Sequence, residues 1–286
     1  MILVLAEVAR SIKNATEKRV KAVIFISYLY QLGMTKFTEE NGYKYIESNP
    51  ESEETIVLLH GLMGGLSNFD GIIDHFSPRY NVVVPALPIF ELPLRKVGLK
   101  GLTNFVEDFV EHKGYKNFHM LGNSLGGHLC ILYCLRKQEL VKSMTLTGSS
   151  GLFENPMGSS WPKRENYEWV KNRVEKTFYD PAVATDDLVR EVFETVNDRN
   201  RVVRIIYAAK SALRNNIENR LKELTIPALL VWGKDDTITP PFVGEKFHEL
   251  LPNSQLVLVD KCGHAPMMEH PSLFNEHLEK FYNSVQ

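Results

Sequence analysis

The chain has 286 residues, of which 44% are hydrophobic and 24% are charged, and its formal net charge is −2. This length suits one large α/β domain or a domain with an insertion. The near-zero net charge excludes a strong field that would attract nucleic acid or anionic membranes. The three cysteines suggest no disulfide framework: Cys130 and Cys134 stand four residues apart in a predicted helix, which is poor disulfide geometry. We therefore expect buried thiols and a cytoplasmic location.

The first 33 residues differ from the rest of the chain. They contain more basic than acidic residues, and residues 22–30 form a short apolar run. That run is too short to span a bilayer and has no convincing small-residue cleavage site. We predict an N-terminal extension, residues 1–33, outside the main fold and without stable membrane insertion; Met34 is an alternative natural start.

From residue 43 onward, predicted strands alternate with predicted helices. The strands are expected at residues 43–47, 55–60, 81–84, 118–121, 142–147, 226–232 and 255–259. The helices are expected at residues 69–76, 102–112, 125–135, 241–251 and 273–282. Fully apolar strands that alternate with amphipathic helices predict a mostly parallel sheet with helices on both faces.

This alternation stops between residues 153 and 224. Helical patterns follow one another there, at residues 167–177, 186–196, 201–213 and about 217–224. Asn155-Pro156 and Asp180-Pro181 mark turns between them. We predict a helical cap at residues 153–224, inserted into a core made of residues 34–152 and 225–286.

The segment Gly122-Asn123-Ser124-Leu125-Gly126 lies between an apolar strand and a helix. This is the G-x-S-x-G pattern in the strand-turn-helix context that gives it meaning. A serine at such a turn is held in a strained conformation with its hydroxyl exposed at the end of the sheet. The glycines avoid a Cβ that would collide with the neighbouring strand or helix.

Two later segments provide partners for Ser124. Asp236 follows the strand at residues 226–232, and His264 follows the last strand. All three residues come after strand ends, and open parallel sheets place ligands at the carboxyl ends of their strands. Asp235 and Glu154 are alternative acids.

Over residues 43–282 the chain resembles the α/β-hydrolase superfamily. Four motifs carry the resemblance, in the expected order: His60-Gly61-Leu62, the Ser124 turn, Gly-x-x-Asp at residues 233–236, and Gly263-His264. The resemblance implies an α/β-hydrolase fold, with a mostly parallel sheet of about eight strands and an inserted helical cap. Its Gly-x-x-Asp spacing selects Asp236 as the acid.

The resemblance also implies roles for these residues. Ser124 would be the nucleophile, His264 its general base and Asp236 the group that orients the imidazole. The backbone N–H groups of Leu62 and Leu125 would form the oxyanion hole. No cofactor and no metal is expected, because these groups supply nucleophile, proton transfer and charge stabilisation.

Substrate contacts are expected from residues near these motifs and from the cap. The predicted set is Asn123, Met63, Trp161 and Met267. Aromatic residues of the cap are expected either to line an apolar acyl site or to hold the cap helices together. His60 is expected to brace the oxyanion loop, whereas His128 and His270 are expected to be structural.

Serine at position 124 argues against dehalogenase and epoxide hydrolase activity, which the resemblance ties to an aspartate nucleophile. It favours a carboxylesterase-like serine hydrolase that cleaves an ester of a small, largely apolar substrate through an acyl-enzyme. A carbon–carbon bond hydrolase of the meta-cleavage-product type is an alternative, since those relatives share Gly-Asn-Ser at the turn. Leu62-Met63-Gly64 and Ala265 depart from that pattern. A third alternative is a small-molecule sensor that retains the triad.

Overall fold

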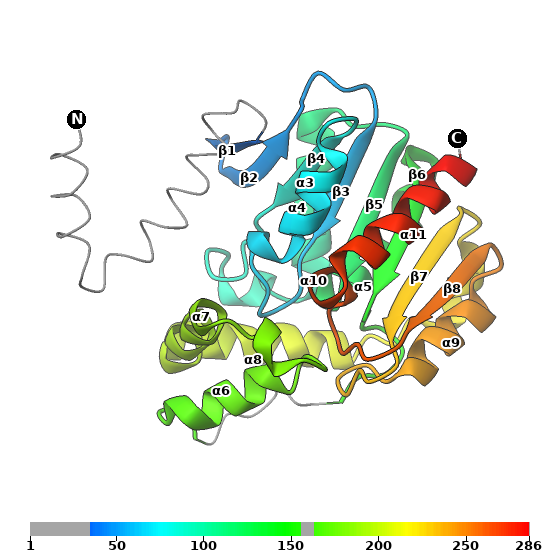
Figure 1. The fold of residues 1–286 in the computed structure, drawn as a ribbon. Helices are drawn as coiled ribbons and strands as arrows, with labels where there is room; N and C mark the ends of the chain where they lie inside the picture. The colour runs from blue at the N-terminus through cyan, green and yellow to red at the C-terminus, as the bar shows by residue number, and fades with distance from the viewer. Residues whose placement is uncertain (1–34, 156–162, 286) are drawn as a thin grey trace, which may run out of the picture.

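The computed structural model describes residues 35–155 and 163–285, and its centre is one eight-stranded sheet (Figure 1). The strands are β1 (Thr35–Glu40), β2 (Tyr43–Ser48), β3 (Thr55–Leu59), β4 (Asn81–Pro85), β5 (Phe118–Asn123), β6 (Val141–Thr147), β7 (Ala228–Gly233) and β8 (Ser254–Val259). Their order in the sheet is β1-β2-β4-β3-β5-β6-β7-β8. The pairs β1/β2 and β2/β4 are antiparallel and all the others are parallel. The predicted mostly parallel sheet of about eight strands is confirmed.

Helices cover both faces of the sheet. One face packs against α4 (Leu99–Lys113), α5 (Leu125–Lys137) and α9 (Pro241–Leu250). The other packs against α3 (Asp70–Phe76), α10 (Pro266–Glu269) and α11 (Pro271–Ser284). Short 3₁₀ helices are η1 (Leu66–Phe69), η2 (Leu94–Lys96), η3 (Gln138–Leu140), η5 (Pro181–Val183) and η6 (Glu218–Glu223).

Central strands such as β3 and β7 are apolar on both sides because each side faces a helical layer. In β3, Ile56 and Leu58 join the cluster with α3 and α11, whereas Val57 and Leu59 join the cluster with α4 and α5. Successive side chains of a strand point to opposite faces, so a strand buried on both faces has no polar alternation. This is why the apolar runs in the sequence predicted these strands.

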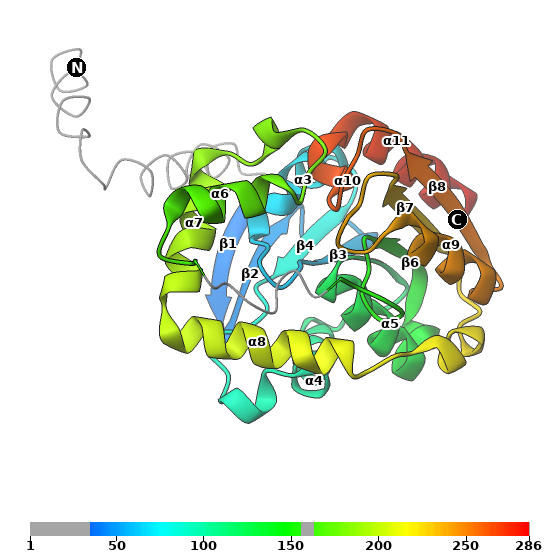
Figure 2. The ribbon, with the colours of Figure 1, turned by 90° about the horizontal axis from the view of Figure 1, so that it is seen from below.

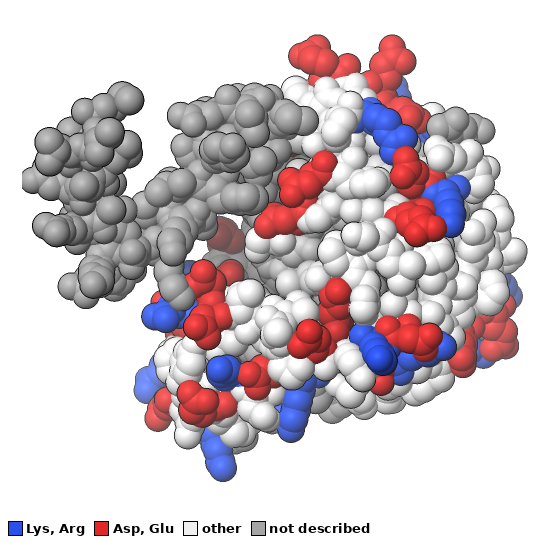
Figure 3. Space-filling model, in the orientation of Figure 1, with Lys and Arg blue, Asp and Glu red and all other residues white. Residues whose placement is uncertain are grey.

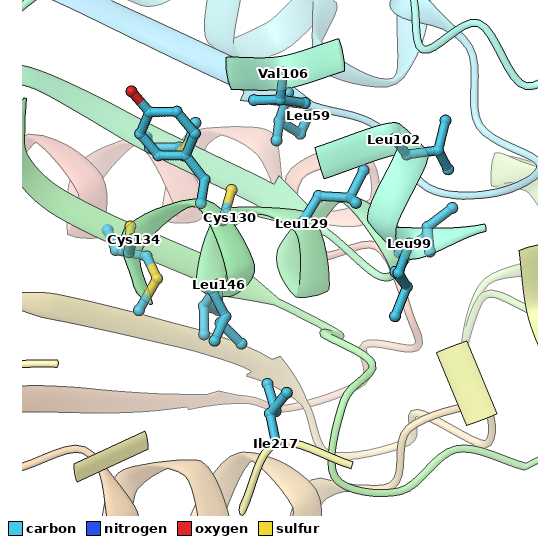
Figure 4. Close-up of a cluster of buried hydrophobic side chains, with 14 of the residues drawn as sticks. Leu59, Leu99, Leu102, Val106, Leu129, Cys130, Cys134, Leu146 and Ile217 are labelled. Atoms are coloured by element: carbon cyan, nitrogen blue, oxygen red, sulfur yellow. The ribbon is translucent and has the colours of Figure 1, made fainter. Parts of the chain in front are cut away.

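Cys130 and Cys134 belong to this core. Figure 4 shows both thiols among leucine side chains, close to Leu129 and Leu146. All three cysteines are free and buried, and burial raises the pKa of the Cys130 thiol well above its ordinary value. They act as small hydrophobic residues, as the sequence predicted.

The structure adds a strand that the sequence analysis missed. Strand β1 pairs with β2 through a two-residue turn, with Glu40 opposite Tyr43. The turn residues Asn41 and Gly42 have φ values of +50° and +82°. Asn-Gly is the preferred pair for a hairpin turn in which both residues have positive φ. The hairpin extends the sheet by an antiparallel edge strand.

Within residues 163–227, between β6 and β7, the structure describes the helices α6 (Tyr167–Glu175), α7 (Asp186–Asn197) and α8 (Arg199–Leu213). Figures 1 and 2 show them gathered across one end of the sheet. The Asp198 side chain accepts hydrogen bonds from the backbone N–H groups of Asn200 and Arg201, which caps α8 directly after α7. The helical segment predicted at residues 153–224 therefore contains these helices and η6.

Charged side chains of both signs are interspersed on the face drawn in Figure 3. Within residues 35–155 and 163–285, no helix combines the length and apolar character needed to cross a bilayer. The predicted extension at residues 1–33 lies outside the described residues.

Candidate active site

Ser124 lies at the turn between β5 and α5. Its φ is +56° and its ψ is −119°, a conformation that costs energy for any residue with a Cβ. Its backbone N–H donates a hydrogen bond to Thr147 O at 3.1 Å, which ties the turn to the end of β6. Ser124 is the last residue before the first turn of α5, so that helix N-terminus points at this site.

The glycines of the motif allow this turn to pack tightly. A Cβ on Gly126 would lie 1.9 Å from Leu59 O, and a Cβ on Gly122 would lie 2.3 Å from Gly126 O. Both distances are far below van der Waals contact, so only glycine fits at either position. The steric reason predicted for these glycines is confirmed.

His264 and Asp236, which are 28 residues apart in the chain, form a buried pair. His264 Nδ1 lies 2.8 Å from Asp236 Oδ2. The two residues are 6% and 3% exposed, so water has little access to the contact. Because Nδ1–H donates to the carboxylate, Nε2 is the nitrogen left to accept a proton.

Asp236 is held by three further hydrogen bonds. Its Oδ1 accepts from the backbone N–H groups of Ile238 and Thr239 at 2.8 and 2.9 Å, and its Oδ2 accepts from Thr239 Oγ1 at 2.8 Å. An aspartate that hydrogen-bonds to N–H groups two and three residues later is a recognised turn pattern. The sequence analysis did not identify Thr239 as a partner of Asp236, although its position three residues after Asp236 was visible in the sequence.

The pKa of His264 reflects two opposing effects. Burial disfavours the charged imidazolium and by itself lowers the pKa. The attraction of the Asp236 carboxylate and its hydrogen bond outweigh burial, so the pKa is raised above its ordinary value. The pair therefore stabilises a protonated imidazole in a site that is otherwise largely dry.

The loop that carries His264 is fixed from two sides. The backbone N–H of His264 donates to Thr177 O at 2.9 Å, in the segment after α6. Asn123 Nδ2 donates to His264 O and to Thr147 O, at 3.1 Å in each case. Asn123, predicted to contact substrate, lines the cavity, and its amide nitrogen also holds the histidine loop against the turn that carries Ser124.

Ser124 and His264 open into one cavity of about 200 Å³. Leu62 and Leu125, the predicted oxyanion residues, line it as well. Most of the wall is apolar and comes from α6, α7, α8 and the surrounding loops: Val174, Phe178, Leu188, Val192, Ala209, Ala212, Leu213, Ile238, Ala265 and Met268. Such a cavity suits a small, largely apolar ligand.

The predicted substrate contacts have different outcomes. Met63 lines the cavity. Met267 does not: it is 2% exposed and packs in the core, while the next residue, Met268, takes the place in the cavity wall. Trp161 lies outside the described residues, as does Met157.

The aromatic residues of α6 and the segment after it have different roles. Phe178 lines the cavity. The Tyr167 ring packs edge-on against Phe193 of α7 at 5.3 Å between centroids, and Trp169 lies under the Arg173 guanidinium at 5.2 Å.

Several polar residues of the wall were missed in the sequence, among them Asn68, Arg173 and Thr177. No motif marks them, because cap helices and loops bring them to the site only through their packing.

Glu154, the alternative acid, also lines the cavity. Its contact with His264 is electrostatic: among the residues that the structure describes, Asp236 is the carboxylate that hydrogen-bonds to the imidazole. Burial raises the pKa of Glu154 to about 7, and His264 lowers it. A carboxyl group that ionises near neutral pH is therefore part of the cavity.

The remaining histidines behave as predicted. His60 Nδ1 donates to Gly61 O at 2.9 Å, and its Nε2 accepts from the Leu87 N–H at 3.0 Å, which braces the loop before Leu62. His128 is buried beside Ser150, and burial lowers its pKa to about 4. His270 Nε2 donates to Lys261 O at 2.9 Å.

Comparisons with known proteins agree with this arrangement. A family model described as alpha/beta hydrolase fold matches residues 54–271. The crystal structure of MGS-MChE2, an α/β-hydrolase enzyme from the metagenome of lagoon sediments at Mar Chica, Morocco, is 39% identical. That match covers 87% of this chain and 98% of the other, with a TM-score of 0.72.

Two curated relatives are more distant. A 2-hydroxy-6-oxononadienedioate/2-hydroxy-6-oxononatrienedioate hydrolase from Pseudomonas sp. is 26% identical over 88% of this chain and 97% of its own length. Lipase 3 from Moraxella sp. (strain TA144) is 26% identical over 79% of this chain and 76% of its own length. The family match covers most of the chain, from β3 to β8 with the Ser124 turn between them, and the chain belongs to the α/β-hydrolase fold family.

Proposed function

We propose that this chain is a carboxylesterase-like serine hydrolase that cleaves an ester of a small, largely apolar molecule through an acyl-enzyme. The observation that carries the proposal is one apolar cavity that contains both Ser124 and a histidine hydrogen-bonded to a buried carboxylate. In this proposal residues 153–224 act as the cap that closes the cavity, and residues 34–152 and 225–286 form the catalytic core.

In the first step Ser124 Oγ attacks the ester carbonyl carbon. His264 Nε2 takes the hydroxyl proton, because its Nδ1–H is already engaged with Asp236 Oδ2. The Asp236 carboxylate stays ionised and stabilises the imidazolium. Collapse of the tetrahedral intermediate breaks the bond to the alcohol, which leaves with the proton from His264.

Negative charge develops on the carbonyl oxygen in this step. The backbone N–H groups of Leu62 and Leu125 are the proposed donors, supported by the position of both residues in the cavity wall. Loss of one such donor typically raises the barrier by about 3–4 kcal/mol.

In the second step water attacks the acyl group on Ser124. His264 removes a proton from the water and then returns it to Ser124 Oγ, which releases the carboxylic acid and restores the free enzyme.

The experiment that tests this proposal is a chain-length panel of p-nitrophenyl esters with Ser124→Ala as the control. We expect turnover of short and medium acyl chains, an initial burst of p-nitrophenol, and loss of turnover in Ser124→Ala. A fluorophosphonate should add to Ser124 and leave Ser124→Ala unmodified in intact-mass spectra. Ligand-induced thermal stabilisation without any turnover would instead indicate a sensor that retains the triad.

A second candidate is hydrolysis of a carbon–carbon bond in a dienoate. Two observations favour it: a curated relative is named as a hydrolase of such compounds, and the Arg173 guanidinium, which suits a substrate carboxylate, lines the cavity. Turnover of a vinylogous diketo acid without turnover of the esters would replace the first proposal. In that case Arg173→Gln should raise KM strongly.

A further inference from the structure

Glu154 has a position in the cavity that the proposed mechanism does not use. It lies in the segment between β6 and α6 and lines the same cavity as Ser124 and His264. The next residue, Asn155, fixes this segment: its backbone N–H donates to Ile238 O at 2.7 Å, and its Nδ2 donates to Thr237 O at 2.6 Å. The backbone next to Glu154 is therefore anchored beside the loop that carries Asp236.

No side chain of residues 35–155 or 163–285 forms an ion pair or a hydrogen bond with the Glu154 carboxyl group. The group is half-buried in a mostly apolar wall. An ionised carboxylate in such a place keeps much of its field, because little water and no bonded cation screens it. A ligand in the cavity meets this field directly.

The other charged groups around the cavity are His264 on the loop after β8, Arg173 on α6, and Asp236 behind His264. Glu269 on α10 also raises the pKa of His264. His264 is the charged group that lowers the pKa of Glu154, and burial outweighs it. Glu154 in turn raises the pKa of His264, so each of the two groups affects the charge of the other.

We propose that Glu154 makes the cavity discriminate against esters that carry a carboxylate and in favour of uncharged esters, an inference that rests on the proposed ester hydrolysis. Glu154 is a specificity-determining residue here, since it acts on the charge of the substrate and not on the reacting bond. The Glu154 carboxylate and a substrate carboxylate repel each other in a poorly screened cavity. This repulsion is enough to change the rate of an anionic ester relative to that of an uncharged ester by about tenfold or more.

The discrimination depends on pH with a definite sign. With a pKa of about 7, Glu154 is mostly protonated at pH 6 and mostly ionised at pH 8. Repulsion of an anionic ester is therefore weak at pH 6 and strong at pH 8. Arg173 stays charged over this range, and protonation of His264 slows both esters alike, so neither changes the ratio of the two rates.

The test compares p-nitrophenyl butyrate with mono-p-nitrophenyl succinate, whose terminal carboxylate replaces the methyl group of butyrate. kcat/KM for both esters is measured at pH 6, 7 and 8 on the full chain, on Glu154→Gln and on Asp235→Asn. Asp235 is exposed, so its variant removes one negative charge close to the site but outside the cavity wall. Thermal melting verifies that each variant is folded.

For the wild type and for Asp235→Asn, we expect a butyrate-to-succinate ratio that rises about tenfold between pH 6 and pH 8. For Glu154→Gln we expect a ratio that is lower at pH 8 by a similar factor and flat with pH. A flat wild-type ratio, or a Glu154→Gln variant that loses activity on both esters equally, would overturn the inference while leaving ester hydrolysis intact. Absence of turnover of either ester by the wild type would instead refute the proposed function.

Discussion

Asn123 gives the sharpest test of how the active site is held together. Its amide nitrogen donates two buried hydrogen bonds, to Thr147 O and to His264 O. In Asn123→Ala both are lost; Thr147 O keeps the Ser124 N–H as a donor, but His264 O loses the amide that holds it. At about 1 kcal/mol for each bond, plus a desolvation cost for an unpaired carbonyl, the free energy of unfolding should fall by about 2–3 kcal/mol.

For a chain of this size, that loss corresponds to a Tm lower by roughly 5–10 °C. The kinetic effect should appear in kcat, because the loop that carries His264 becomes less well positioned. A displacement of about 1 Å at reacting groups costs up to about 100-fold in rate. We expect kcat for p-nitrophenyl butyrate to fall by roughly 10- to 100-fold, with KM almost unchanged, in assays well below the lowered Tm.

Asn275→Ala is the matched control. Its amide nitrogen donates a hydrogen bond to Gly71 O at 2.8 Å, where α11 packs against α3, and neither residue lines the cavity. That variant should lose about half as much stability and keep the wild-type kcat. An Asn123→Ala enzyme with the wild-type Tm and kcat but a raised KM would refute this reasoning. It would indicate that Asn123 contacts the substrate and does not position the His264 loop.

Three other changes test the remaining features. Asp236→Asn should reduce kcat by about 10⁴-fold, because the imidazole loses its orienting charge; activity within tenfold of the wild type would refute the assignment. Since the pKa of His264 is raised and its neutral form is the base, kcat/KM for butyrate should rise with pH through the near-neutral range to a plateau, with its midpoint above the ordinary imidazole value of about 6.5. A profile that falls over that range would contradict the role of the pair. Gly126→Ala should prevent stable folding, because its Cβ would meet Leu59 O at 1.9 Å. Gly114 has a φ of +69° and open space around it, so Gly114→Ala should lower the free energy of unfolding by only about 1–2 kcal/mol in a urea denaturation series. Equal losses of stability in the two variants would refute the steric account.

Much of the sheet and its catalytic edge was predictable from the sequence, because both depend on local patterns. Strands such as β3 and β7 are apolar at successive positions, which burial on both faces explains. The Ser124 turn is marked by its glycines, whose absence of Cβ the packing requires. Strand β1 was missed because it is a polar edge strand, although Asn41-Gly42 carried the hairpin signal.

The cavity wall was less predictable, because it depends on how α6, α7 and α8 pack over the end of the sheet. The amphipathic pattern of α8 identifies an apolar side but does not say that Ala212 faces the cavity. Met267 and Met268 show most clearly why the residues of the cavity wall are hard to predict from the sequence. Successive residues of a helix differ in direction by about 100°, so a one-residue difference separates the core from the cavity wall.

The cavity wall and the chemical groups come from different segments of the chain, and this allows the substrate of such an enzyme to change separately from its reaction. The chemical groups come from turns that follow β5, β7 and β8, whereas α6, α7 and α8 come from one uninterrupted stretch of chain between β6 and β7. Grafting that stretch from a relative would exchange the preferred substrate while the reaction stays the same. The carbonyl of Thr177 is the attachment that such a chimera has to preserve, since it holds the His264 loop from the cap side.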